Sequence, residues 1–490
     1  MTPWGRILAG VVATVIVGVS GCTVGPDYVF PTEPTPAAWS SPVTKGLTET
    51  ASVVPSWWAA FNDAELDSLI QRAARSNLDL RVSEARLRQA RAVRAMGVAE
   101  FWPTIDSTDS AARQKQSQNQ PLIGSLPLPA DFPFEYSVYN AGFDASWEID
   151  LFGAKRRALE ASTAEWQGAI EARNNVMVSL LAEVARNYIE LRGSQHRLAI
   201  ARQDLTLQDD ALALTRDRFH GGVATELDVT RAAAVLAGVQ AAIPPLEAEM
   251  RASIVRIAVL NGQQPGDLVA ELTPSKPIPP TPPEIPIGLP SDLLRRRPDV
   301  RQAERQLAAE TARIGVAKAE WFPKLSLTGD VGVESVHLGN WFQPNSLFWS
   351  IGPSLQWRAL DFGRVRAEVQ AQTAVQEAAL ATYEKVVLTS LQEAEIALVA
   401  YAQEQNHHAA LTEQVAQSRR SLVMANGLYT KGRVNFLDVL DAQRSLIQAD
   451  DQLAQSDQAV SIDLIALYKA LGGGWETLTT SLETASTKAP

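Results

Sequence analysis

The sequence predicts a mainly α-helical protein with some β-structure, built from two tandem copies of one unit. Apolar residues recur every seven positions along 170–219, and the set 210 residues later does the same except for one histidine. Segments in which apolar and polar residues alternate precede both helices. The two heptad sets are Ile170, Met177, Val184, Leu191, Leu198, Leu205, Leu212, Phe219 and Leu380, Val387, Ala394, Tyr401, His408, Val415, Leu422, Tyr429. Such spacing is typical of coiled coils, and an internal repeat indicates a tandem architecture.

Composition excludes several classes of protein. Of 490 residues, 46% are hydrophobic and 20% are charged, which indicates a folded chain. A net charge of −11 without a basic stripe argues against nucleic-acid binding. Cys22 is the only cysteine, so the chain has no internal disulfide and no cysteine-based metal site.

Residues 1–21 are interpreted as a signal peptide. Arg6 precedes the apolar run 7–19, which is shorter than a membrane span of about 20 residues. The run ends in Val19-Ser20-Gly21-Cys22, which resembles a bacterial lipobox, a motif whose cysteine is acylated and becomes the new N-terminus. An ordinary secretory signal with an incidental cysteine is the alternative. Thr23, rather than aspartate, implies sorting to the outer membrane among signals of this kind.

The rest of the chain divides into two repeats and their connections. A lipidated tether at 22–56 has six prolines after Cys22, and the linker 273–290 has eight. The expected order is tether 22–56, repeat 1 at 57–272, linker 273–290, repeat 2 at 291–474 and a flexible tail at 475–490. Within each repeat we expect a helix (63–100, 291–322) that a proline ends, a strand pair (103–152, 323–361) and a long helical hairpin (153–262, 363–472).

The second copy has ten fewer residues between its strands, which places a solvent-exposed loop at 121–135 of the first copy. The first strand, 103–119, has the least regular alternation. Each hairpin has a long arm of about 65 residues, or roughly 100 Å at 1.5 Å per residue. The return arms have only about 40 residues, so the preceding helices are expected to stack end to end with them. Pro244-Pro245 should kink the first return helix.

The alternating strands are long enough to cross a bilayer. In 139–151, residues such as Phe143 and Trp147 share one face, and residues such as Asp144 share the other. Four such strands leave open edges that a bilayer does not tolerate, so other copies of the chain must complete a barrel. The helical hairpins carry many charges, including Arg202 and Asp209, and are not expected to span the membrane. A barrel joined to water-exposed hairpins indicates a tube.

Several motifs resemble the TolC-like outer-membrane efflux family, specifically its lipoprotein, NodT-type branch that works with RND-type pumps. The motifs are Gly21-Cys22-Thr23-Val24-Gly25-Pro26-Asp27-Tyr28, Asp150-Leu151-Phe152-Gly153, Leu289-Pro290-Ser291-Asp292-Leu293-Leu294 and Leu437-Asp438-Val439-Leu440-Asp441-Ala442-Gln443. The resemblance implies a homotrimer with a 12-stranded transmembrane β-barrel, four strands from each chain, and a coiled-coil α-helical barrel in the periplasm. It also implies passive export of small molecules that an inner-membrane pump and a periplasmic adaptor deliver, with no cofactor beyond the lipid on Cys22.

The resemblance also places a gate near the second hairpin tip. By motif, the apolar constriction falls on Leu437 and the acidic ring on Asp441, with Asp438 as a second acidic candidate. Carboxylates from three chains around a narrow axis repel one another and attract cations. Alternatively, both acids are solvated residues near a helix N-terminus, which favours them anyway. The first copy has Thr230-Arg231 instead of Leu440-Asp441, so its tip should not duplicate the gate.

The turns Gly222-Val223 and Gly432-Arg433 resemble the family's docking sites for adaptor hairpins. They are equally consistent with ordinary turn glycines. Tyr429 resembles a tip tyrosine that locks the closed state by hydrogen bonding across hairpins; alternatively, it is the last residue of the seam.

No enzyme is expected. His407 and His408 are adjacent, unlike the i, i+4 spacing of a helical zinc pair, and His408 is expected to be packed or paired. No phosphate-binding glycine loop or nucleophile elbow stands out. Two alternatives stay open, an exit duct for type I protein secretion and a non-conducting envelope scaffold.

Overall fold

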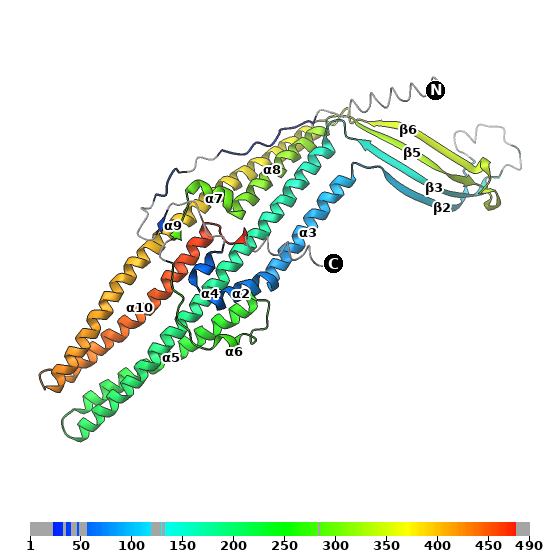
Figure 1. Ribbon diagram of the computed structural model, residues 1–490. Coiled ribbons are helices and arrows are strands. Elements are labelled where there is room, and N and C mark those ends of the chain that lie inside the picture. Colours follow the sequence, from blue (N-terminus) through cyan, green and yellow to red (C-terminus); the bar gives the residue numbers. More distant parts are fainter. Residues whose placement is uncertain are drawn as a thin grey trace. The chain divides into compact units, whose positions relative to one another are not determined.

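The computed structural model describes residues 23–32, 36–40, 47–48, 56–118, 129, 133–282 and 285–476 (Figure 1). Cys22, the predicted signal peptide 1–21, most of the loop 121–135 and the tail from 477 lie outside the described residues. The chain divides into two compact units, a sheet unit (1–31, 88–167, 305–381) and a hairpin unit (32–87, 168–304, 382–490).

The sheet unit contains the four predicted strands. They are β2 (Thr104–Lys115), β3 (Glu135–Ile149), β5 (Lys324–Ser335) and β6 (Leu347–Gln356), all antiparallel in the order β2-β3-β5-β6. The short 3-10 helices η3 (Leu338–Asn340) and η4 (Pro344–Ser346) lie between β5 and β6. Even the irregular segment 103–119 forms a strand, while β3 begins four residues before the alternation at 139.

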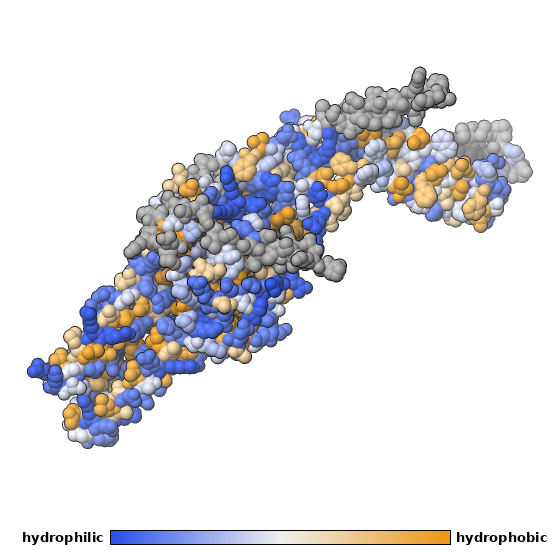
Figure 2. Space-filling model, in the orientation of Figure 1, coloured by the Kyte–Doolittle hydropathy of each residue, from blue (hydrophilic) through white to orange (hydrophobic). Residues whose placement is uncertain are grey.

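The strand register reproduces the internal repeat. Thr104 lies opposite Ser146 in the first hairpin, and Lys324 lies opposite Gln356 in the second, 220 and 210 residues later. Because facing residues share a side of the sheet, the odd-numbered apolar residues form one face. Much of this face is exposed in the single chain (Figure 2), including Phe143, Val331, Trp349, Ile351 and Leu355. A bare apolar sheet face needs a nonpolar environment.

Two helical hairpins of equal size follow the strands. Their long arms, α4 (Ala154–His220) and α9 (Arg364–Thr430), have 67 residues each, and their return arms, α5 (Glu226–Leu260) and α10 (Phe436–Ala470), have 35 each. The heptad prediction is confirmed where the core is deepest. Met177, Val184, Leu191, Val387, Ala394 and Tyr401 are buried.

Among the described residues, only α5 is long and apolar enough for a membrane span. Pro244 and Pro245 lie inside this helix, and the kink expected there stays a prediction. Its neighbour is α4, because Arg202 of α4 forms an ion pair with Glu247 of α5 at 2.8 Å. The apolar residues of α5 therefore belong to a hairpin rather than to an isolated span.

The helices that precede the strands differ from prediction, because each is divided. The segment 63–100 forms α2 (Ala64–Ser76) and α3 (Leu78–Ala99), and 291–322 forms α7 (Pro290–Arg296) and α8 (Pro298–Ala319). The residue at each break binds the end of a return helix.

Asn77 Nδ2 donates to the carbonyl of Leu260 at 2.9 Å, and Arg297 Nη1 donates to that of Ala470 at 3.0 Å. The end-to-end stacking is confirmed. The breaks have a physical reason, since the last carbonyls of a helix lack partners within it.

The hairpin unit also holds the linker and part of the tether. Trp57, in η1 (Trp57–Phe61), stacks on Tyr468 at 5.3 Å between ring centroids. The short helix α6 (Val269–Leu272) leads into the linker, where β4 (Ile285–Pro286) pairs in parallel with β1 (Leu47–Thr48) of the tether. Trp39 Nε1 donates to the Gly288 carbonyl at 2.9 Å. The prediction assigned Trp475 to the flexible tail, but this residue packs against the hydrophobic core of the hairpin unit. The tether is thus held against the linker.

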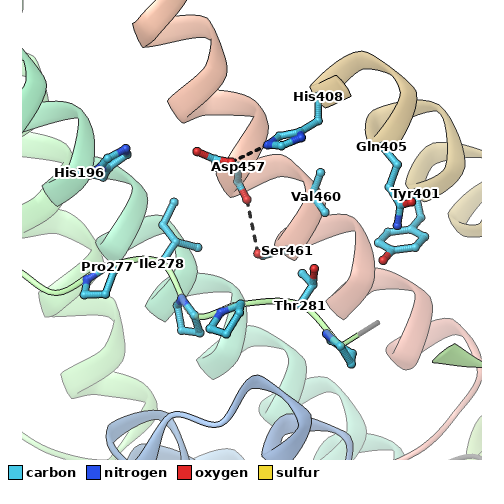
Figure 3. Close-up of a pocket in the computed structure, with 13 residues that line it drawn as sticks. His196, Pro277, Ile278, Thr281, Tyr401, Gln405, His408, Asp457, Val460 and Ser461 are labelled. Carbon is cyan, nitrogen blue, oxygen red and sulfur yellow. Dashed lines mark hydrogen bonds and ion pairs between the residues drawn. The ribbon is translucent and has the colours of Figure 1, made fainter. Parts of the chain in front are cut away.

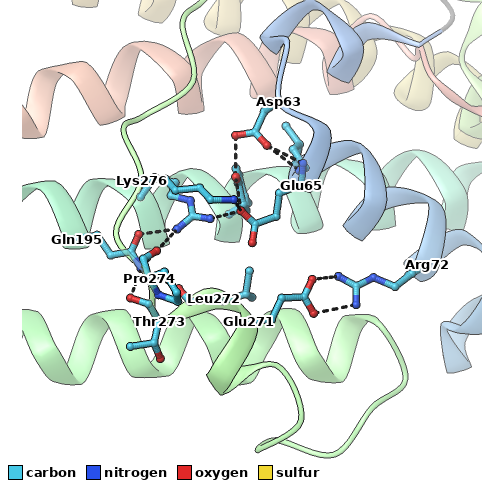
Figure 4. A network of polar contacts seen from close by, with 12 residues as sticks. Asp63, Glu65, Arg72, Gln195, Glu271, Leu272, Thr273, Pro274 and Lys276 are labelled. Carbon is cyan, nitrogen blue, oxygen red and sulfur yellow. Dashed lines mark hydrogen bonds and ion pairs between the residues drawn. The ribbon is translucent and has the colours of Figure 1, made fainter.

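A buried polar network fastens the linker to α4 (Figure 4). The Arg192 side chain is fully buried and forms an ion pair with Glu65 of α2. Its Nη1 donates to Gln195 Oε1 at 2.6 Å and to the Pro274 carbonyl at 3.1 Å. Lys276 reaches the same Glu65 carboxylate at 2.6 Å. Arg192 therefore joins three segments that lie far apart in the sequence.

The start of α2 is fixed by the same network. Asp63 caps the helix by accepting hydrogen bonds from the backbone N–H groups of Glu65 (2.8 Å) and Leu66 (3.0 Å). Its second oxygen accepts the Tyr188 hydroxyl at 2.7 Å. Burial, followed by the hydrogen bond to Asp63, raises the pKa of Tyr188, which stays neutral as a donor.

Removing Arg192 should therefore cost much of the stability of the hairpin unit. We expect Arg192→Ala to destabilise the fold by about 3–5 kcal/mol, because Glu65 would keep a charge without its main partner. Arg186→Ala is the matched control, since its pair with Glu190 is exposed and should contribute less than about 1 kcal/mol. Chemical denaturation of both variants measures the difference, and equal effects would contradict the role given to Arg192.

Candidate functional site

The two hairpin tips have the same backbone geometry. Gly222 and Gly432 have φ angles of 72° and 66°, a region that L-residues rarely adopt. Their N–H groups donate to the carbonyls of Phe219 and Tyr429, each at 3.0 Å. The left-handed turn by itself requires glycine. This requirement supports the interpretation of the two residues as ordinary turn glycines.

The tips also leave room for a partner. A Cβ added to either glycine would meet nothing within 4 Å. Val223 is 81% exposed, and Arg433 is exposed as well. Adaptor docking at Gly222-Val223 and Gly432-Arg433 stays a prediction that this open surface permits.

The structure separates the two acidic gate candidates. Asp438 Oδ2 accepts the N–H of Asn435 at 2.9 Å and so caps the start of α10. In the first copy, Asp228 does the same with the N–H (3.0 Å) and hydroxyl (2.7 Å) of Thr225. These hydrogen bonds lower the pKa of Asp228. This capping role supports the alternative that Asp438 is an acid favoured at a helix N-terminus.

Leu437 and Asp441 project from the first turns of α10. Leu437 is 49% exposed and Asp441 is also exposed, whereas Leu440 between them is buried. Arg231 of α5 occupies the position that corresponds to Asp441 in the first copy. An apolar and an acidic side chain are therefore both available at the second tip.

Tyr429 connects the two tips. The guanidinium of Arg218, at the end of α4, lies 4.6 Å from the Tyr429 ring centroid, and the Phe436 ring lies 5.6 Å away. A cation over an aromatic face contributes about 0.5–2 kcal/mol. Arg218 is a further residue of this site, and its one signal in the sequence is its place in the last turn of a helix.

Farther along the hairpins, charged pairs join α10 to α4 and to α9. Arg197 of α4 binds Asp451 of α10 at 2.7 Å, and Arg419 of α9 lies 3.6 Å from Asp450. Within the described part of the chain, Asp204 of α4 forms no ion pair of this kind. Burial, together with the charges of Asp450 and Asp451, raises its pKa to about 6.

A cavity of about 730 Å³ lies between the linker segment Pro277–Pro282 and helices α4, α9 and α10 (Figure 3). His408 Nε2 lies 2.6 Å from Asp457 Oδ1 at its wall. The prediction that His408 is packed or paired is therefore confirmed. No group of three potential metal ligands occurs within the part of the chain that the structure describes.

The profile of the family described as "Outer membrane efflux protein" matches residues 69–263 and 289–473. The chain belongs to this family. The two matched segments cover most of the two structural repeats and leave out residues 264–288, which include most of the proline-rich linker. The fold class, with two repeats and a helical as well as a β part, is that of the family, and the protein is an outer-membrane efflux protein.

Individual relatives and a solved structure are similar to this chain along nearly its whole length. Nodulation protein T of Rhizobium leguminosarum bv. trifolii is 31% identical over 93% of this chain and 95% of its own. The pyoverdine export outer membrane protein OpmQ of Pseudomonas aeruginosa is 32% identical over 87% and 89%. The structure of the outer-membrane channel OprN superposes with a TM-score of 0.86 at 39% identity, covering 93% of this chain and 100% of that one.

The contact between α4 and α10 should depend on pH through Asp204. Because the fold raises the pKa of Asp204 to about 6, above the value of the unfolded chain, the folded state binds this proton more tightly and stability is lost as the pH rises through about 6. Asp204→Asn should raise the midpoint of thermal unfolding at pH 7.5 by about 2 °C or more. The gain should shrink as the pH falls towards 4.

A matched control is Asp209→Asn on the same helix, where the side chain is exposed and no gain is expected. An equal gain for both variants would indicate general charge reduction instead of the Asp204 contact.

Proposed function

We propose that this protein is the outer-membrane channel of a tripartite efflux system, through which small molecules leave the cell passively. One observation supports this most. The sheet has an exposed apolar face and two edge strands, within a chain whose other unit consists of long charged hairpins. A sheet of this kind is stable in a bilayer only when other strands close it into a barrel. A non-conducting scaffold would not need such a face.

The proposed assembly is a homotrimer with twelve strands and twelve long helical segments. Four strands per chain are too few for a barrel, which needs eight or more. The exposed apolar residues along α9, such as Val375, Leu388 and Ile396, also support contacts with further copies.

The proposed lipid on Cys22 would enter the membrane at the end of the sheet. The next residues are held firmly there, because Val24 N–H donates to the Phe152 carbonyl at 3.2 Å. Arg157, whose side chain is only 4% exposed, binds Asp27 at 2.6 Å. Residues 24–27 are therefore fixed next to the start of α4. This attachment would keep the acyl chains on Cys22 close to the strands.

The proposed gate consists of Leu437 and Asp441 at the second tip, with Tyr429 and Arg218 holding the tips together. Asp438 is the second acidic gate candidate. Its hydrogen bond with the N–H of Asn435 also caps the start of α10. Opening the gate would require the tips to separate. Adaptor hairpins that dock at Gly222-Val223 and Gly432-Arg433 would supply the free energy for this step.

The proposed partners are a periplasmic adaptor and an inner-membrane RND-type pump, which selects the substrates. Relatives are named as pyoverdine export, antibiotic efflux and toluene efflux outer membrane proteins. These names support small-molecule export over the type I protein-secretion duct. Loss of the gene should therefore raise susceptibility to toxic small molecules and leave protein secretion unchanged.

Asp441 should control ion selectivity. In planar bilayers, Asp441→Asn is expected to lower the cation-to-anion permeability ratio by about twofold or more, because a charge at a narrow opening acts on every passing ion. Asp209→Asn, eleven residues before the end of α4, should leave the ratio unchanged. The absence of channel events from the unchanged protein would favour a scaffold.

Arg218 and Tyr429 should hold the closed state through the ring rather than the hydroxyl. Tyr429→Phe should keep the closed state, whereas Tyr429→Ala and Arg218→Ala should raise the open-to-closed ratio by about fivefold, for a contact of about 1 kcal/mol. The control is Arg216→Ala, an exposed residue two positions away. If Tyr429→Phe opens the channel as much as Tyr429→Ala, a hydrogen bond is the lock.

A further inference from the structure

The cavity between the linker and the helices α4, α9 and α10 has no role in the proposed function. One wall is the linker segment 277–282, which we call the strap, and the other walls are side chains of the three helices (Figure 3). All of these residues belong to the hairpin unit. The volume of about 730 Å³ is that of a site for a small molecule.

The strap is stiff and is held at both of its ends. Four of its six residues are prolines, whose rings restrict the backbone. Before the strap, the carbonyl of Pro274 accepts a hydrogen bond from Arg192 at 3.1 Å, and after it β4 pairs with β1. Between the described residues, 277–282 forms no backbone–backbone hydrogen bond. The strap therefore crosses the helices without the bonds that would draw it onto them, and the cavity stays open.

The lining of the cavity accepts more hydrogen bonds than it can donate. Every residue of the strap has a carbonyl, but only Ile278 and Thr281 have an N–H group. Asp457 is the one carboxylate among the lining residues, which include neither lysine nor arginine. A bound anion would thus lack a strong cationic partner, whereas a cation would find a carboxylate and several carbonyl oxygens.

The Asp457 carboxylate is oriented and still has a free oxygen. Its Oδ1 lies 2.6 Å from His408 Nε2 on α9, and its Oδ2 has no hydrogen-bond partner within the described part of the chain. In Figure 3, the carboxylate on α10 and the His196 ring on α4 point toward each other. His408 therefore positions the carboxylate and leaves its second oxygen for a ligand.

The remaining walls are apolar. Val460, Ile278 and the ring of Tyr401 line the cavity together with the proline rings of the strap. Water can satisfy the carboxylate, but it gains nothing from apolar walls. A cationic group is also favoured over an aromatic face. A ligand with a charged nitrogen and a short hydrocarbon stem would suit both parts of this lining.

We propose that this cavity binds a small organic ammonium cation with a short hydrocarbon stem. Asp457 is the charge partner of the ammonium group, and the carbonyls of the strap are further acceptors. The bound cation would join the strap to α10. This site goes beyond the proposed function, because every residue that lines it comes from one chain and none belongs to the proposed gate.

Calorimetric titration of the full-length protein in detergent with cadaverine (1,5-diaminopentane) tests the proposal. We expect one site per chain with a Kd between about 10 µM and 1 mM. Salt at about 150 mM suppresses non-specific attraction to a chain with a net charge of −11. Pentane-1,5-diol has the same carbon chain without the charge and should bind about tenfold more weakly or worse. Glutarate reverses the charge and should not bind. Equal binding of cadaverine and the diol would overturn the proposal.

Three variants locate the site. Asp457→Asn should weaken cadaverine binding about tenfold or more. Asp463→Asn is the matched control on the same helix, since its side chain lines a different cavity, and should leave the affinity unchanged. Ile278→Trp should fill the cavity and abolish binding, and thermal unfolding checks that each variant is folded. Unchanged affinity in a folded Asp457→Asn or Ile278→Trp variant would overturn the site.

The outcomes are separate from those of the proposed function. A protein that conducts ions in bilayers but does not bind cadaverine would overturn this inference and leave the channel intact. A protein that binds cadaverine through Asp457 but forms no channel would overturn the proposed function and leave this site.

Discussion

Backbone hydrogen bonding in a medium without water is the constraint on which the rest of the structure depends. In the described sheet, β2 pairs only with β3, and β6 pairs only with β5. Each unpaired N–H or carbonyl in hydrocarbon costs several kcal/mol. Closure by further copies removes this cost, and the number of copies then sets how many hairpins surround the axis.

The long elements could be predicted because their signals are local and occur twice. Heptad spacing indicated α4 and α9, and alternation indicated β3 and β6, within a few residues of the observed bounds. The repeat also supported the weaker strand β2, whose own alternation is poor. The break at Asn77 could not be predicted, since it depends on the carbonyl of Leu260, more than 170 residues away. The break at Arg297 did have a local signal, because Pro298 follows it and disfavours a helical conformation at the preceding residue.

The candidate site was partly predictable for the same reason. The turn glycines follow from positive φ angles that a helix–turn–helix requires, and the capping role of Asp438 follows from its place near a helix start. The contact of Arg218 with Tyr429 depends on how two tips pack, which no local pattern encodes. The docking of the tether also depends on tertiary contact. Gly25 lies so near Gly315 that a Cβ on the former would come within 2.4 Å of the latter's Cα.

The difference between the two tips has a consequence for how the aperture can change in evolution. Asp441 in one half corresponds to Arg231 in the other, so the acidic side chain occurs at the second tip and a basic side chain stands at the same position of the first tip. A single nucleotide change in either half of the gene alters the ring by several charges at once, and in a direction set by the half that mutates. The charge of the rim can therefore be changed through either half of the chain independently of the other.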